Sequence, residues 1–89
     1  MLPSHEMKII HDCAKEYGAK EIILFGSALR DPQTANDIDL GVLGIQPQKF
    51  FALYGDLLMK LRKPVDLVDL SESSKFTDLI FKRGIKIYG

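Results

Sequence analysis

The stretch FGSALRDPQTANDIDL, residues 25–40, decides the fold because it joins two apolar runs through a glycine-serine turn. The first run, residues 21–25 (EIILF), is short and apolar throughout, which predicts a strand covered on both faces. The second run, residues 37–43 (DIDLGVL), predicts another strand. Only residues 26–36 connect the two strands, and parallel neighbours usually need a crossover of about a dozen residues or more. Antiparallel pairing of the two strands is therefore favoured.

The rest of the chain predicts further helices and strands in alternation. Apolar residues at helical spacing predict helices, and short β-branched runs predict strands. The expected helices are Ser4–Tyr17, the short turn Ser27–Arg30, Pro47–Leu61 and Ser73–Arg83, and the further strands are Val65–Leu70 and Ile85–Tyr88. This order, α-β-α-β-α-β-α-β, predicts an α/β (α+β) fold, a small mixed β-sheet of three to four strands with helices packed on it. We find no repeat and no linker, so we expect one domain over residues 1–89.

Helical periodicity also identifies side chains that we expect in the core. The helix expected at Pro47–Leu61 has one apolar face, formed by Phe50, Leu53, Tyr54, Leu57, Leu58 and Leu61. In the last helix, the residues expected to face inward are Phe76, Leu79 and Ile80. Ser4 is expected to cap the first helix, and Cys13 to lie in the core.

The composition argues against several classes of function. The sequence has 12 Lys and Arg against 12 Asp and Glu, so no strong positive field draws it to nucleic acid or to an anionic membrane. Its apolar runs are far shorter than the ~20 residues of a membrane span, and the first residues lack the apolar segment of a signal peptide. The single cysteine, Cys13, cannot form an internal disulfide and fits a reducing compartment. We therefore expect a cytoplasmic protein without a cysteine-based metal site.

Asp37 and Asp39 are the first candidates for a functional site. Because side chains alternate along a strand, these two carboxylates share one face while Ile38 and Leu40 point to the other. Adjacent carboxylates repel unless positive charge lies between them, and paired carboxylate oxygens are the usual ligands of Mg²⁺. Taken alone, the pattern would also suit an exposed strand edge that discourages aggregation.

The Gly26-Ser27 turn supplies the second half of the expected site. Gly26 lets a ligand approach the backbone closely, and the first amide hydrogens of the turn face an anion. Ser27 adds a hydroxyl donor, and Arg30 lies near enough to the turn to reach a phosphate or a carboxylate. A phosphate site and an acidic metal site are thus expected side by side.

The strand, the Gly-Ser turn, the Asp-x-Asp strand DIDL and the later strand VDLV (65–68) follow one another in an order that resembles the polymerase-β-like nucleotidyltransferase superfamily. Within that superfamily, the length and layout look like the minimal nucleotidyltransferase (MNT) domains, small prokaryotic proteins often encoded beside a HEPN-domain partner. The resemblance covers essentially the full chain, from the leading helix to the terminal RGIKIYG.

The resemblance implies a role for each candidate residue. Gly26 and Ser27 match the phosphate-binding turn, beside which Arg30 lies. The catalytic and metal-binding carboxylates that it implies are Asp37, Asp39 and Asp66. Asp69 is the other choice for the third carboxylate, and alternation puts it on the opposite face of its strand from Asp66.

Three residues depart from the pattern of the family. Leu29 and Asp31 stand where members commonly have Ala and Gly, and Asn36 stands where they usually have Ser before the first aspartate. Asp31 places a negative charge close to the expected triphosphate, and Arg30 partly offsets it.

By resemblance, the activity is the transfer of a nucleoside monophosphate, AMP from ATP or the equivalent from another nucleoside triphosphate, to a hydroxyl group, with two Mg²⁺ ions. The chain has little room to bind an acceptor, so another chain would present it in a homo- or hetero-oligomer. The resemblance implies a tyrosine of a HEPN-domain partner, which would make this chain the antitoxin of a toxin-antitoxin pair. The alternative is a non-catalytic module that neutralises its partner by binding.

Overall fold

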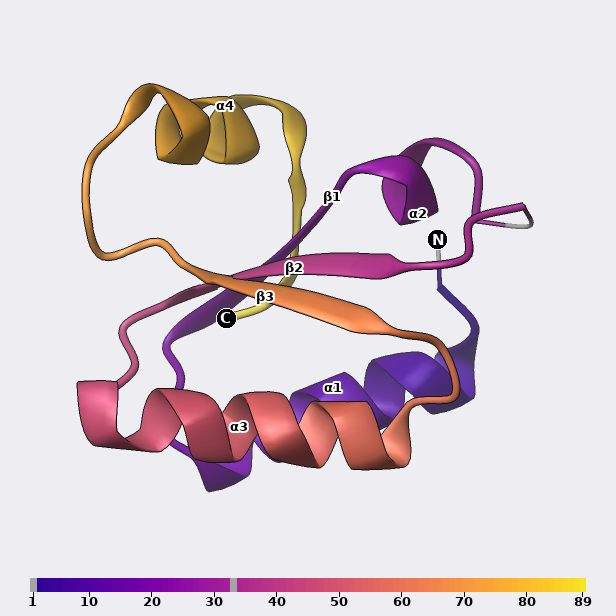
Figure 1. The fold of residues 1–89 in the computed structure, drawn as a ribbon, viewed down its shortest axis with the longest axis horizontal. Coiled ribbons are helices and arrows are strands. Elements are labelled where there is room, and N and C mark those ends of the chain that lie inside the picture. The colour runs from indigo at the N-terminus through magenta and orange to yellow at the C-terminus, as the bar shows by residue number, and fades with distance from the viewer. Residues whose placement is uncertain (1, 33) are drawn as a thin grey trace.

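The computed structural model describes residues 2–32 and 34–89, and this part of the chain contains four helices and four strands (Figure 1). The helices are α1 (Ser4–Glu16), α2 (Ser27–Arg30), α3 (Pro47–Lys60) and α4 (Lys75–Arg83). The strands are β1 (Glu21–Phe25), β2 (Ile38–Leu43), β3 (Val65–Asp69) and β4 (Ile85–Tyr88). The predicted alternation of helices and strands is confirmed.

The strands form one mixed sheet in the order β3-β2-β1-β4. β1 pairs antiparallel with β2, as its short connection predicts, and also antiparallel with β4. β2 pairs parallel with β3, and α3 forms the crossover between them, as a parallel connection requires. The expected α/β fold with a small mixed sheet is therefore confirmed.

The helices cover the two faces of the sheet unequally. Figure 1 shows α1 and α3 side by side on one face, α4 on the other face, and α2 at the end of β1. The larger core lies on the α1 and α3 side and includes Ile22, Leu24, Leu40 and Leu57. A smaller cluster on the α4 side is formed by Ile23, Leu70 and Ile80. Because both faces of β1 are covered, its uninterrupted apolar run is explained.

Several element ends differ from the prediction by one or two residues. Ser4 is the first residue of α1 and not its cap, because the first turn closes on the carbonyl of Pro3, which accepts from the amides of Glu6 and Met7 at 3.1 and 3.0 Å. β2 begins at Ile38, whose amide donates to the carbonyl of Pro64. Asp37 therefore precedes the strand that was expected to contain it.

Three side chains that were expected in the core are exposed: Leu58 at 49%, Phe76 at 53% and Leu79 at 46%. The prediction was wrong for them because the apolar face of each helix is wider than the surface that covers it. In α4 only Thr77 and Ile80 are buried. In α3, by contrast, Leu53 and Leu57 are fully buried, as expected.

The remaining expectations for the core are met. Cys13 is buried, and burial raises the pKa of its thiol. Phe50 and Tyr54 pack against the main core, and Leu61 is buried in it. Among the described residues, no helix combines the length and the apolar character that crossing a membrane requires.

Candidate active site

The Gly26-Ser27 turn lies where β1 ends and α2 begins. Gly26 has φ 75°, a left-handed conformation that residues with a side chain rarely adopt, and its carbonyl accepts from the amides of Leu29 and Arg30 at 3.2 and 3.3 Å. A Cβ at Gly26 would overlap the carboxylate of Asp39. Glycine is therefore required at this position for two reasons, the backbone angle and the close approach of an acidic side chain.

Asp39 lies at the centre of the candidate site because its strand is central in the sheet. It is opposite Phe25 of β1 on one side and opposite Asp66 of β3 on the other. Residues in register on neighbouring strands point to the same face, so Asp39 and Asp66 lie side by side on the face that carries α4. Asp37 stands just before β2, and Asp39 is half-buried between it and the turn.

The pKa of Asp39 reflects the neighbouring carboxylates. The pKa of Asp39 is raised, first by burial, then by the negative charges of Asp66 and Asp37, and also by hydrogen bonding with Asp66. Each of these effects favours the neutral acid over the carboxylate. A cation among these side chains would act in the opposite direction and favour the ionised form.

The strand register distinguishes the two candidates for the third carboxylate, Asp66 and Asp69. Asp66 is in register with Asp39, whereas Asp69 is in register with Val42, three residues further along β2. The Oδ1 atom of Asp69 accepts from the amide of Ser71 at 2.9 Å and so stabilises the turn after β3. The geometry therefore brings Asp66, and not Asp69, next to Asp39.

Tyr54 of α3 contacts the same region through its hydroxyl group. The hydroxyl donates to the carbonyl of Val65 at 2.8 Å and lies 3.5 Å from Oδ1 of Asp66. The sequence assigned Tyr54 to packing alone, because helical periodicity reports the ring and not the hydroxyl. The contact places a polar group of α3 beside one of the candidate carboxylates.

The donor set fits a divalent cation chemically. Carboxylate oxygens are the ligands that Mg²⁺ prefers, and the pKa of Asp39 is raised by burial and by the negative charges of its two acidic neighbours. Within residues 2–32 and 34–89, no group of three or more His, Cys, Asp or Glu side chains is arranged to hold a metal ion. The strand register nevertheless places Asp39 next to Asp66.

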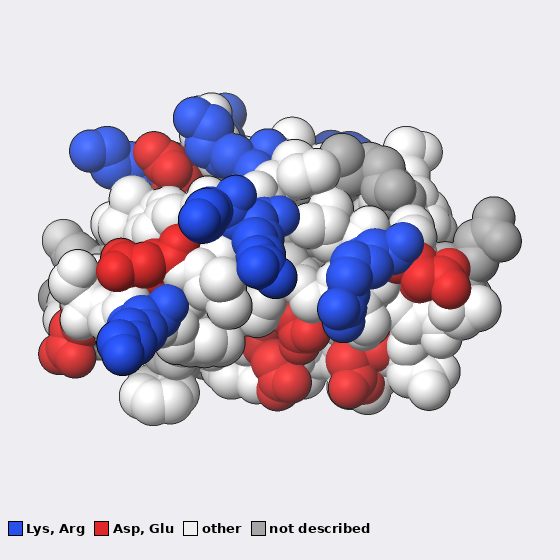
Figure 2. Space-filling view, turned by 90° about the horizontal axis from the view of Figure 1, so that it is seen from above, with Lys and Arg blue, Asp and Glu red and all other residues white. Residues whose placement is uncertain are grey.

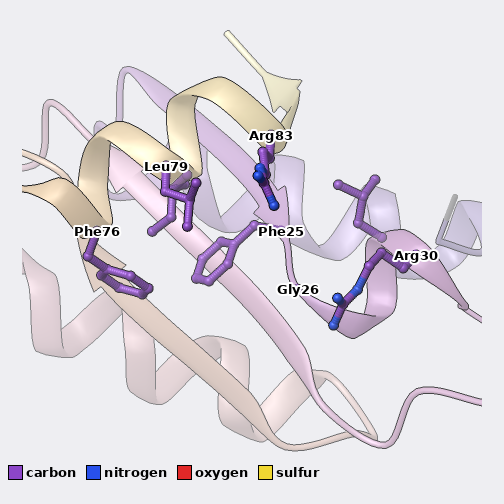
Figure 3. A pocket seen from close by; sticks show the side chains of 8 residues that line it. Phe25, Gly26, Arg30, Phe76, Leu79 and Arg83 are labelled. Atoms are coloured by element: carbon purple, nitrogen blue, oxygen red, sulfur yellow. The ribbon is translucent and has the colours of Figure 1, made fainter.

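A pocket of about 240 Å³ adjoins the turn on the α4 side. Figure 3 shows Phe25 and Gly26 at its base, Arg30 reaching in from α2, and Phe76, Leu79 and Arg83 projecting from α4. The sequence identified Gly26 and Arg30 but not the residues of α4. Phe76 and Leu79 were placed in the core by their spacing, and no local pattern indicates that Arg83 borders a cavity.

Both signs of charge occur on the face that carries α4. In Figure 2, which looks onto this face, Lys and Arg side chains lie at the upper left, in the middle, at the right and at the lower left, and Asp and Glu side chains are interspersed among them and near the lower edge. A ligand that combines phosphates with divalent cations needs both kinds of surface. The face is therefore neither uniformly basic nor uniformly acidic.

Comparison with known proteins identifies one family. The model of the family described as polymerase beta, nucleotidyltransferase, matches residues 7–89. A search of curated proteins finds no match.

Solved structures give matches over nearly the whole chain. A chain in the crystal structure of a toxin-antitoxin with AMP-PNP is 28% identical, with a TM-score of 0.76, over 93% of this chain and 73% of that chain. A chain in a structure of a tri-AMPylated Shewanella oneidensis HEPN toxin in complex with MNT antitoxin is 25% identical, with a TM-score of 0.73, over 97% and 71%. A chain of the toxin-antitoxin MntA-HepT, at 24% identity and a TM-score of 0.73 over 98% and 73%, supports the fold alone.

Proposed function

Because the chain belongs to the polymerase beta nucleotidyltransferase family, we propose that it transfers AMP from ATP to a hydroxyl group with the help of Mg²⁺. The observation that carries this proposal is the position of Asp39, which contacts the Gly-Ser turn and lies in register with Asp66. An acidic cluster and a phosphate-binding turn then meet at one point of the sheet. We include in the proposal that residues 1–89 act as one minimal nucleotidyltransferase domain.

In this proposal the carboxylates and the turn have separate tasks. Asp37, Asp39 and Asp66 would hold two Mg²⁺ ions, which when bound supply positive charge to the attacking and leaving oxygens. Ser27 donates its hydroxyl hydrogen to the phosphates, and the first amides of α2, which have no acceptor within the helix, donate alongside it. Arg30 adds a cationic donor on the same side.

The chemical step is a displacement at the α-phosphorus of ATP. The acceptor oxygen forms a bond to phosphorus while the bond to the oxygen bridging the α- and β-phosphates breaks, and pyrophosphate leaves. Asp66 accepts the proton of the acceptor hydroxyl, because it lies on the edge strand, where another chain can present that hydroxyl. The contact from Tyr54 orients this carboxylate.

We propose a HEPN-domain protein as the acceptor, with a tyrosine as the modified residue and this chain as the antitoxin. The support is the 28% and 25% identity to chains of the toxin-antitoxin with AMP-PNP and of the AMPylated HEPN toxin with MNT antitoxin.

The proposal is tested by incubating the protein with ATP labelled at the α-phosphate, Mg²⁺ and the product of the neighbouring gene. We expect label on the partner with the natural chain and none with Asp39→Asn, because an amide cannot supply the negative charge that the site requires. Asp69→Asn is the matched control: its Oδ1 atom still accepts from Ser71, so transfer should continue.

Two outcomes would overturn the proposal. Undiminished transfer by Asp39→Asn would remove the carboxylate from the chemistry. Tight binding of the partner without any label would support the non-catalytic alternative, in which the chain neutralises its partner by contact.

A further inference from the structure

The pocket between α2 and α4 brings together two arginines from distant parts of the sequence. Arg30 borders it from α2 and Arg83 from the last turn of α4, with Gly26 between them (Figure 3). The remaining lining is apolar and includes Leu29 and Leu79. The pocket thus combines an apolar wall with two guanidinium groups beside the turn.

Within the described part of the chain, neither arginine forms an ion pair with a carboxylate. In residues 2–32 and 34–89 the ion pairs are Lys8 with Asp12 and Lys60 with Asp56, and both are far from this pocket in sequence. Two guanidinium groups at one cavity repel each other, and an anion bound between them removes this repulsion. Planar guanidinium groups match phosphate oxygens especially well, because they can donate two parallel hydrogen bonds.

The backbone of Arg83 is held firmly over the end of β1. The next residue, Gly84, donates its amide hydrogen to the carbonyl of Ile80 at 2.7 Å. A Cβ at Gly84 would meet the side chain of Ile23 and the carbonyl of Leu24, so the chain passes directly against the strand. This close packing sets the distance between the end of α4 and the Gly-Ser turn.

The start of α4 is anchored to the same strand. Phe76 packs edge-on against Phe25, with ring centroids 6.0 Å apart. Both ends of the helix therefore contact the last residues of β1, which positions α4 beside the Gly-Ser turn.

We propose that Arg83 is a phosphate-binding residue that acts with Arg30 to hold the β- and γ-phosphates of the nucleotide. This inference rests on the proposed function and extends it, because it assigns α4 a part in nucleotide binding. The α-phosphate then lies toward Asp39, which contacts Gly26 at the edge of the pocket. When the bond to the α-phosphorus breaks, the negative charge of the leaving pyrophosphate develops between the two arginines.

A purely structural role for Arg83 makes a different prediction. A cation in the last turn of a helix interacts favourably with the helix dipole. Loss of that interaction would lower the stability of the protein, but it would affect nucleotides with one, two or three phosphates alike.

The experiment measures the affinities of ATP, ADP and AMP by calorimetry in the presence of Mg²⁺ for the natural chain, Arg83→Gln and Lys82→Gln. Lys82 is a basic residue of the same turn that does not line the pocket, so its variant is the matched control. We expect Arg83→Gln to lose about tenfold or more in affinity for ATP and ADP, as the loss of charged hydrogen bonds predicts, and to bind AMP unchanged. Lys82→Gln should match the natural chain, and Arg83→Lys should fall between the two.

The outcomes separate this inference from the proposed function. If the natural chain binds ATP and Arg83→Gln binds it equally well, or loses ATP and AMP in the same proportion, only the role of Arg83 is refuted. If the natural chain with Mg²⁺ does not bind ATP at all, both the proposed function and this inference are refuted.

Discussion

Asp39 is the residue whose ionised form the folded structure disfavours and the proposed function requires. Its carboxylate is half-buried, contacts Gly26, and has two acidic neighbours that raise its pKa together with burial. In the absence of a cation, ionising this group in the folded protein is unfavourable. Acidic side chains that raise one another's pKa in this way are expected at a metal site rather than in a contact that stabilises the fold.

The stability of Asp39→Asn should therefore depend on pH. In the unfolded chain the pKa of Asp39 is near its ordinary value of 3.8, and in the folded protein it is higher, so the folded state binds the proton more tightly. The favourable contribution of Asp39 to the free energy of unfolding is fully present at pH values below that ordinary pKa. This contribution is lost as the pH rises through the raised pKa of the folded protein. Without Mg²⁺, we expect the variant to melt a few degrees above the natural chain at neutral pH.

Melting curves at several pH values in the presence of a chelator provide the measurement. The advantage of Asp39→Asn should shrink as the pH falls toward the ordinary pKa of 3.8, below which the natural side chain is protonated in the folded and the unfolded state. An advantage that stays the same from neutral to acidic pH, or a variant less stable than the natural chain at neutral pH, would contradict this account.

Among the helices and strands, the pocket depends most on α4, which forms one of its walls. It is a helix of 9 residues with only Thr77 and Ile80 buried, so packing alone holds it weakly. Its start is fixed by hydrogen bonds: Ser74 Oγ accepts from the amide of Thr77 at 3.1 Å, and Thr77 Oγ1 donates to the carbonyl of Glu72 at 2.9 Å. The stability of this helix therefore depends strongly on its cap.

Removal of the cap by Ser74→Ala should cost about 0.5–2 kcal/mol of the free energy of unfolding. For a domain of this size, each kcal/mol lowers Tm by about 4–8 °C. Hydrogen exchange should show the largest loss of protection in the amides of α4. Ser73→Ala, next to the cap but outside the helix, is the control and should change neither quantity; equal effects of the two variants would refute the capping role.

The whole molecule assembles the candidate site from segments that are far apart in the chain. Asp39 belongs to β2, Asp66 to β3, Arg30 to α2 and Arg83 to α4. The sheet order β3-β2-β1-β4 places the strands so that these residues gather around the end of β1. Because the site exists only when all of these elements are folded, its ligand should stabilise the entire fold.

Addition of ATP with Mg²⁺ should therefore raise Tm. A ligand at about 100 times its Kd that binds only the folded state adds about 2.7 kcal/mol, which corresponds to about 10 °C or more here. Addition of a chelator should remove most of this shift, and Asp39→Asn should show little of it. A shift that is the same with and without Mg²⁺ would argue against the metal site.

The sequence by itself determined the elements and one half of the site. Apolar periodicity located the helices and strands to within one or two residues, and the short connection over residues 26–36 predicted the antiparallel pairing of β1 with β2. Alternation predicted that Asp39 shares a face with Asp37, although β2 begins only at Ile38, and the prediction of a phosphate site at the Gly26 turn stays a prediction. These features could be read from the sequence because each depends on residues that are close neighbours in the chain.

Only the tertiary structure decided which distant residues meet. The residues alone left Asp66 and Asp69 both open, and the parallel register of β3 with β2 placed Asp66 beside Asp39. Periodicity assigned Phe76 and Leu79 to the core, yet they border a pocket that Arg83 shares. An apolar pattern shows which face of a helix can be buried, but the neighbouring elements determine how much of that face is covered, and those neighbours come from other parts of the chain.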